Sequence, residues 1–142
     1  RDLHVRSRRQ RQMCIRDRQW MLVDMHTQLE AARLLLQKAA SAGTSGARTS
    51  GHGFPDMLEA AQAKIFASET AIKVTNDALQ IFGSAGYSRN LPLERMSRDA
   101  RMFTIGGGTA QILRTVVASA LLGRKLPQTR DGHFKLSQKE NK

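Results

Sequence analysis

With 142 residues, the chain is long enough for one domain with a hydrophobic core, and no apolar run approaches the roughly 20 residues that a membrane-spanning helix needs. Aromatic residues make up only 5 % of it, whereas alanine, leucine, methionine and glutamine are plentiful, which favours helices over sheets. A net charge of +11 is typical of proteins that bind nucleic acid or an anionic membrane, but nearly half of this charge lies at the start of the chain.

The first 18 residues form a segment unlike the rest. They carry seven arginines and two aspartates and so contribute +5 of the net charge, while residues 19–142 contribute +6. The stretch MCIRDR, from Met13 to Arg18, looks like a translated sequencing-adaptor end, and we interpret residues 1–18 as non-native. A solvated basic helix and a nucleic-acid-binding arm are the two alternatives. Cys14, the only cysteine, lies in this segment, so the remainder offers no disulfide, zinc cluster or thiol nucleophile.

Residues 19–42 predict an amphipathic helix. Its apolar residues recur at steps of three and four, which places them on one face. They are Leu22, Met25, Leu29, Ala32 and Leu36. Gly43 suits the end of this helix, and the glycine- and serine-rich stretch 41–53 predicts a flexible connector to the next one.

A second helix is expected from Phe54 to about Phe82. Pro55 suits its first turn, and Asp56 suits the positive end of the helix dipole. Apolar residues occupy two of its faces. One face holds Leu58, Ala61, Ile65 and Ile72, and the other holds Ala71, Val74, Ala78 and Ile81. Such a helix is covered from several sides, as in a bundle or an oligomer interface.

Two shorter helices complete the prediction. One covers residues 91–101, and Thr109 can cap the last, over residues 110–122. Six residues are expected to form the buried stripe of the last helix: Ile112, Leu113, Val116, Val117, Ala120 and Leu121. Residues 124–142 predict a mobile basic tail. Because the connections are short and no strand pattern occurs, we predict an all-α fold, an antiparallel helical bundle over residues 19–123.

The run Gly106-Gly107-Gly108-Thr109 is the main candidate for a functional turn. Three glycines remove every side chain at the entry to the last helix, which permits positive φ and close approach of a ligand to the backbone. The N–H groups at the helix start then face that ligand and suit a phosphate or a carbonyl oxygen. A tight interhelical turn with Thr109 as its cap is the alternative, and the glycines by themselves do not decide between the two.

Several motifs follow one another in a specific order. Gln80-Ile81-Phe82-Gly83 comes first, followed by Gly86-Tyr87, then Arg98-Asp99-Ala100, and last the glycine run. This order resembles the C-terminal helical domain of the acyl-CoA dehydrogenases, and the resemblance covers residues 19 to about 126. It implies a flavoprotein with FAD as its cofactor.

The resemblance also implies roles for two groups of residues. Thr109, Ala110 and Gln111 correspond to the turn that contacts the flavin, and Gly108 to a residue near the acyl thioester. A second group would reach the adenosine-diphosphate part of a neighbouring subunit's flavin. It consists of Gln80, Ile81, Phe82, Gly83 and Ser84, the last of which is usually a glycine in the family.

The pattern departs from the family at Gly107. Family members often carry Tyr-Glu-Gly-Thr here, with the glutamate as catalytic base, and glycine cannot abstract a proton. Members that act on isovaleryl-CoA or long-chain substrates supply the glutamate from an earlier helix, which would lie upstream of residue 1, and this is our expectation. The alternative is a member that carries out no dehydrogenation. No catalytic residue is therefore assigned within the chain.

The resemblance implies that the complete enzyme oxidises an acyl-CoA thioester to trans-2-enoyl-CoA, with an electron-transferring flavoprotein as acceptor. It implies a homo-oligomer, a dimer or a tetramer, in the bacterial cytoplasm or in the mitochondrial matrix of a eukaryote. The 142-residue chain alone is expected to be inactive, and neither nucleic acid nor a membrane is an expected partner. A non-catalytic basic bundle for oligomerisation, or for binding nucleic acid or protein, is the alternative from another class.

The remaining polar residues are interpreted as structural. Four charged residues of the third helix are expected in salt bridges that support the loop beneath the active site: Glu94, Arg95, Arg98 and Asp99. No metal site is expected. Neither His4 nor His133 is assigned a carboxylate or cysteine partner, His26 is interpreted as solvated or at the edge of the core, and His52 as solvated.

Overall fold

The computed structural model describes residues 2–44 and 56–127, and these contain helices and turns but no strand. The all-α prediction is therefore confirmed. The helices are α1 (Asp2–Thr44), α2 (Met57–Phe82), α3 (Ser84–Tyr87), α4 (Leu93–Phe103) and α5 (Ala110–Leu121). None of these helices is long and apolar enough to cross a membrane.

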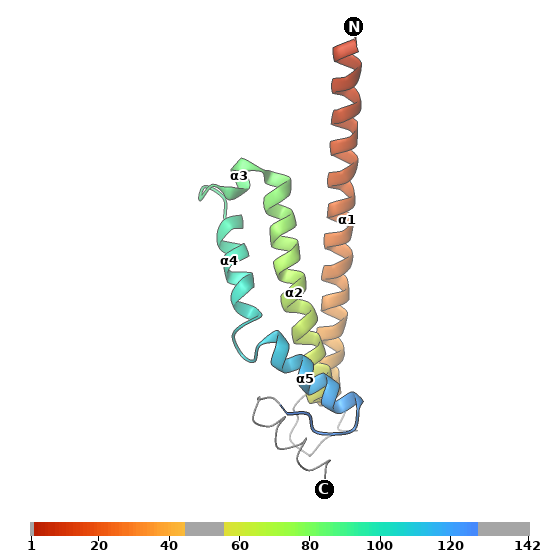
Figure 1. Ribbon diagram of the computed structural model, residues 1–142, viewed down its shortest axis with the longest axis vertical. Helices are drawn as coiled ribbons and strands as arrows, with labels where there is room; N and C mark the ends of the chain where they lie inside the picture. The colour runs from red at the N-terminus through yellow and green to blue at the C-terminus, as the bar shows by residue number, and fades with distance from the viewer. Residues whose placement is uncertain (1, 45–55, 128–142) are drawn as a thin grey trace, which may run out of the picture.

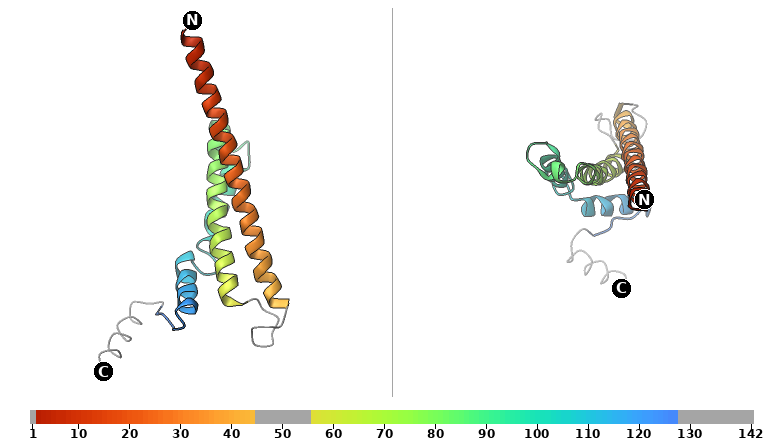
Figure 2. Two further views of the ribbon diagram at one scale, coloured as in Figure 1. Left: turned by 90° about the vertical axis from the view of Figure 1, so that its right-hand side faces the viewer. Right: turned by 90° about the horizontal axis from the view of Figure 1, so that it is seen from above.

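Helix α2 is the centre of the arrangement. The backbones of α1, α4 and α5 each pack against α2, whereas α1 does not approach α4 or α5 (Figure 1). Both α1 and α4 run antiparallel to α2, and the view from above places α2 between them (Figure 2). The predicted antiparallel bundle is thus observed, with α5 against the first half of α2. Coverage of α2 from several sides, expected from its apolar faces, is also confirmed.

Helix α1 begins earlier than expected. The prediction started it at residue 19, but it runs without a break from Asp2 to Thr44. Residues 2–18 contain neither glycine nor proline and are rich in arginine, a good helix former, so nothing in their propensities ends the helix. The interpretation of residues 1–18 as non-native stays a prediction. The connector and the C-terminal tail lie almost entirely outside the described residues.

The apolar stripe of α1 is only partly buried. Ala32 is 6 % exposed, but Leu22 is 54 % and Leu36 is 49 % exposed. The sequence predicted only that these residues share one face of α1. Within this chain the backbone of α1 packs against α2 alone, so part of that face stays uncovered. The small residues make the contact, and the large ones beside them remain uncovered.

Helix α2 begins at Met57, three residues later than the predicted start at Phe54, and it ends at Phe82 as predicted. The carboxylate of Asp56 accepts a hydrogen bond of 3.4 Å from the N–H of Leu58. Gly83 follows with φ +59°, and its N–H donates to the carbonyl of Leu79 at 2.9 Å. A residue in the left-handed region therefore ends the helix, as the glycine predicts.

The later helices differ from the prediction in detail. α3 was not predicted, since Gly83 and Gly86 were interpreted only as helix breakers. Gly86 is buried, and a Cβ there would lie 2.9 Å from the Cβ of Phe82, so glycine permits close packing of α3 on the end of α2. α4 is shifted by two residues from the expected range. Of the stripe predicted for α5, Leu113, Val116 and Val117 are half-buried, whereas Ile112, Ala120 and Leu121 are exposed.

Removal of residues 1–18 is expected to leave the fold intact. Arg16 to Trp20 are exposed, and this part of α1 extends beyond the end of α2 (Figure 1). We expect a melting temperature within about 2 °C of the full chain, the shift expected from surface changes of a few tenths of a kcal/mol. Thermal unfolding followed by circular dichroism measures this. A large drop in melting temperature would show that the segment is part of the folded domain.

Candidate functional site

The turn between α4 and α5 contains the glycine run. The N–H of Gly106 donates to the carbonyl of Met102 at 2.8 Å, and the N–H of Ala110 closes the turn on the carbonyl of Thr104 at 3.1 Å. Gly107 has φ +66° and Gly108 has φ +94°, both in the region that disfavours other residues. Two of the three glycines are therefore required by the backbone of the turn.

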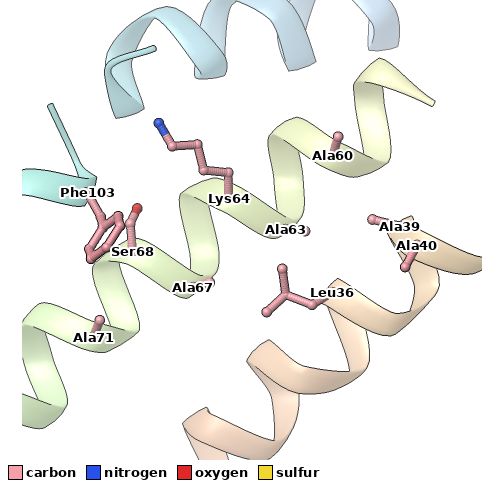
Figure 3. A pocket seen from close by; sticks show the side chains of 10 residues that line it. All are labelled: Leu36, Ala39, Ala40, Ala60, Ala63, Lys64, Ala67, Ser68, Ala71 and Phe103. Atoms are coloured by element: carbon pink, nitrogen blue, oxygen red, sulfur yellow. The ribbon is translucent and has the colours of Figure 1, made fainter. Parts of the chain in front are cut away.

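Lys64 of α2 holds this turn through its ammonium group. Its Nζ donates to the carbonyls of Gly107 at 2.9 Å and Gly108 at 2.7 Å, and it also donates to the carbonyl of Gly106. An ammonium has three donors, so all of them are used on three consecutive carbonyls. Figure 3 shows the lysine extending from α2 on the side away from α1. This contact was not found by sequence reasoning.

A signal for Lys64 was nevertheless present in the sequence. On α2 it lies four residues after Ala60 and four before Ser68, positions that share one helix face. A long cationic side chain among such short neighbours extends its charge beyond them, to water or to a partner on another element. The sequence does not say which partner, because Lys64 and the glycine run are separated by 42–44 residues.

The opposite side of the turn presents free backbone donors. The N–H groups of Gly107, Gly108 and Thr109 belong to the same peptide units whose carbonyls bind Lys64. In a trans peptide the N–H points away from the carbonyl. None of these three N–H groups has an acceptor in the part of the chain that the structure describes. On one side of the turn, the carbonyls are thus bound by Lys64. On the other side, the N–H groups are available to bind a ligand.

Helix α5 is fixed relative to α2 by two further interactions. The hydroxyl of Thr109 accepts a hydrogen bond of 3.2 Å from the N–H of Ile112, which confirms the predicted N-cap. One terminal nitrogen of Arg114 donates to both carboxylate oxygens of Glu69, at 2.6 and 2.8 Å. Ala110 is buried, whereas Gln111 is exposed.

Gly107 leaves the turn without a carboxylate. A Cβ built on Gly107 would lie 3.4 Å from the Nζ of Lys64, an ordinary contact distance. A glutamate at this position would meet no steric barrier at its Cβ, but the left-handed φ would lower the stability of the folded protein by roughly 1–2 kcal/mol. Crowding therefore does not exclude an acid from this position, whereas the left-handed φ of Gly107 disfavours one.

The segment Gln80–Ser84 lies elsewhere, at the far end of α2 (Figure 1). Gln80 and Phe82 are exposed, and a Cβ on Gly83 would meet nothing within 4 Å. Gln80 follows Lys64 by sixteen residues on one helix, which corresponds to about 24 Å at roughly 1.5 Å per residue. One copy of the chain does not bring the two predicted groups of site residues together.

The charged residues of α4 pair within their own helix. Arg98 donates to Glu94 at 3.0 and 3.2 Å, and this hydrogen bond raises the pKa of the exposed Arg98 guanidinium. The expected pairing is therefore found for Glu94 and Arg98, as an i,i+4 pair on the surface of α4. Arg95 and Asp99 are exposed, and His26 is exposed on α1. Over residues 2–44 and 56–127, no group of three or more possible metal ligands occurs.

An apolar groove of about 500 Å³ lies along α2 beside the stem of Lys64 (Figure 3). α1 contributes Leu36, Ala39 and Ala40 to its wall, and Phe103 at the end of α4 forms part of another side. Most of the remaining wall consists of alanines of α2. Ser68 also lines the groove, and its hydroxyl donates to the carbonyl of Ile65 at 3.1 Å. Among the described residues, the lining therefore includes no carboxylate and no imidazole that could act as a general base.

Residues 3–122 match the family described as acyl-CoA dehydrogenase, C-terminal domain. The chain belongs to the acyl-CoA dehydrogenase family. The match begins at residue 3, whereas the resemblance was expected to begin at Gln19. The match therefore includes most of α1, which starts at Asp2.

Named relatives in the acyl-CoA dehydrogenase family differ in activity. The 3-sulfinopropanoyl-CoA desulfinase of Advenella mimigardefordensis is 66 % identical over 120 residues, which cover 84 % of this chain and 28 % of that protein. A probable acyl-CoA dehydrogenase of Mycobacterium tuberculosis is 45 % identical over 105 residues, 73 % of this chain and 25 % of that protein. The solved butyryl-CoA dehydrogenase of Megasphaera elsdenii superposes with a TM-score of 0.66 at 41 % identity, over 73 % of this chain and 25 % of that one.

The chain thus spans about a quarter of the length of these acyl-CoA dehydrogenase relatives. Its own residues fit a flavin cofactor at two points. The turn offers three free N–H donors at the start of α5, and Gly83 leaves open space for close approach to the backbone.

Proposed function

We propose that this chain is the C-terminal domain of an FAD-dependent flavoprotein that removes the sulfinate group from a 3-sulfinoacyl-CoA thioester. The observation that carries the proposal is Gly107. In dehydrogenases of this family a glutamate often occupies this position of the turn, and a glycine there cannot take the α-proton that dehydrogenation must remove. The higher identity to a desulfinase than to a dehydrogenase, 66 % against 45 %, supports the same choice.

The overall reaction requires no external oxidant. In 3-sulfinopropanoyl-CoA the bond between C3 and sulfur breaks and a C–H bond forms at C3, so that carbon is reduced. The sulfur takes the oxygen of one water molecule and leaves as hydrogen sulfite, so that sulfur is oxidised by the same two electrons. The two hydrogens of the water appear in propanoyl-CoA and in hydrogen sulfite. An electron-transferring flavoprotein is accordingly not a stoichiometric partner in this reaction.

The residues of this chain would bind the flavin and the acyl thioester and orient them toward each other. FAD supplies the redox-active ring, and the protein supplies position and electrostatics. Thr109, Ala110 and Gln111 would contact the flavin ring, and Gly108 would lie near the thioester, where a side chain would obstruct the substrate. The free N–H groups of the turn suit the carbonyl oxygens of either molecule.

A homo-oligomer is part of the proposal. Gln80–Ser84 lies about 24 Å along α2 from the level of the turn, taking roughly 1.5 Å per residue. This segment would therefore serve the adenosine-diphosphate part of a flavin bound mainly by a second copy. The large exposed apolar residues of α1 and α5, such as Leu22, Leu34 and Leu121, provide surface for such contacts. The bacterial relatives favour a place in the bacterial cytoplasm.

Sulfite release by the intact protein tests the proposal. The complete flavoprotein that carries this chain is incubated with 3-sulfinopropanoyl-CoA under argon, without an electron acceptor, and sulfite and propanoyl-CoA are measured. We expect both products in equal amounts over many turnovers. Butyryl-CoA with a one-electron dye as acceptor is the parallel assay.

Dehydrogenation with a glutamate from an upstream helix is the second candidate. The 41 % identity to a butyryl-CoA dehydrogenase of similar fold favours it. Acceptor-dependent formation of an enoyl-CoA, together with no sulfite from the sulfinate substrate, would establish this candidate and refute the desulfinase.

A further inference from the structure

Lys64 is the only described side chain that binds the glycine turn from another helix through its carbonyls. Three consecutive carbonyls, those of Gly106, Gly107 and Gly108, converge on its Nζ. A carbonyl oxygen bound to a cation draws electron density from its own peptide unit, and hydrogen bonds linked in this way strengthen one another. The N–H groups on the opposite side of these units are therefore stronger donors than ordinary amides.

The same contact fixes the direction of those donors. Gly107 and Gly108 adopt positive φ, and glycine backbones have more freedom than any other residue. Backbone hydrogen bonds hold the two ends of the turn, at Gly106 and Ala110, whereas Lys64 is what holds the carbonyls of Gly107 and Gly108 between them. Without Lys64 the N–H groups of this middle part would vary more in direction. Glu69 and Arg114 anchor α5 to α2 further along, but Glu69 does not bind the turn itself.

We infer that Lys64 is a positioning residue, which acts through the glycine turn to aim and polarise the N–H groups of Gly107, Gly108 and Thr109 toward the flavin and the acyl thioester. Lys64 itself touches neither molecule, because its three donors are used on the turn. The inference rests on the proposed location of the turn beside the flavin.

Substitution of Lys64 in the intact flavoprotein tests the inference. Lys64→Met keeps the unbranched side chain up to its fourth atom and removes the ammonium with all three donors. We expect kcat for sulfite release to fall about 10- to 100-fold, the loss typical of removing a partner that orients a site, with little change in KM. The absorption spectrum of the bound flavin should shift, and backbone amides of residues 104–112 should exchange hydrogen at least about tenfold faster.

Lys73→Met is the matched control. Lys73 lies on the same helix, and its ammonium binds Asp77 at 2.9 Å within that helix. This control removes an equal charge and an equal side chain without touching the turn, and it should behave as the unaltered protein. An equal loss in Lys64→Met and Lys73→Met would overturn the inference, as would wild-type kcat, flavin spectrum and exchange in Lys64→Met.

Lys64→Arg decides the matter if Lys64→Met fails to fold or to retain FAD. A planar guanidinium keeps the charge but cannot converge on three carbonyls as an ammonium does. We expect an intermediate kcat and a shifted flavin spectrum, and fully wild-type behaviour would refute the positioning role. Because exchange and the flavin spectrum need no substrate, a flavin-bound protein that releases no sulfite would refute the desulfinase proposal alone.

Discussion

The isolated 142-residue chain is expected to purify without colour and without activity. The chain spans about a quarter of its relatives, and the two segments proposed to bind FAD lie about 24 Å apart along α2, at roughly 1.5 Å per residue. Each segment alone offers only a few hydrogen bonds, which do not repay the loss of translational and rotational freedom on binding. Absorbance at 450 nm after gel filtration with excess FAD measures retention.

The intact flavoprotein under the same procedure is the control for this result, and it should elute with one flavin per subunit. A yellow 142-residue chain with stoichiometric FAD would contradict the expectation. It would mean that the glycine turn and the end of α2 form a sufficient site, within one copy or between copies of this domain.

Gly107→Glu in the intact protein is expected to lower sulfite release by about thirtyfold. The new carboxylate would lie beside the proposed substrate site, where it would repel the sulfinate of the substrate. Two unit charges 4 Å apart repel by about 4 kcal/mol at an effective dielectric constant of 20. The Nζ of Lys64 would lie 3.4 Å from the new Cβ, and we take its positive charge to halve this repulsion. The remaining roughly 2 kcal/mol corresponds to about thirtyfold in rate.

Gly107→Ala separates charge from backbone strain in this experiment. Alanine carries the same cost of a left-handed φ, roughly 1–2 kcal/mol, but no charge. We expect Gly107→Ala to melt at a lower temperature, like the glutamate variant, while losing much less kcat. Equal loss of kcat in both variants would assign the effect to strain. A gain of sulfite release in Gly107→Glu would refute the proposed role of the glycine.

Local signals in the sequence predicted the helices best. Asp56 lies at the start of α2, Gly83 lies at its end, and Thr109 caps α5. These positions could be predicted because a helix cap involves only residues a few positions apart in the sequence. The start of α1 was predicted at residue 19 because residues 1–18 were set aside as non-native and their helix propensity was not considered. α3 was missed because Gly86 was interpreted as a helix breaker. The sequence around it does not show that this glycine is buried and permits close packing of α3 on α2.

Contacts between residues far apart in the chain could not be predicted from the sequence. The periodicity of α1 and α5 correctly identified apolar faces, but Leu36 and Leu121 are exposed because burial depends on which elements are present to cover them. Residue types in the glycine turn pointed to a ligand, whereas the lysine that holds the turn comes from another helix. The glycine at position 107 could be seen in the sequence, but it did not by itself lead to the desulfination proposed above.

The anchoring of the turn by Lys64 has a consequence for exchanging parts between relatives. A loop transplanted as residues 104–109 alone would arrive with three carbonyls directed at whatever side chain the recipient helix carries. The unit that can be exchanged is the loop together with the first half of α2, which are far apart in the gene. Chimeras with a crossover anywhere between them separate the two halves of one structural element.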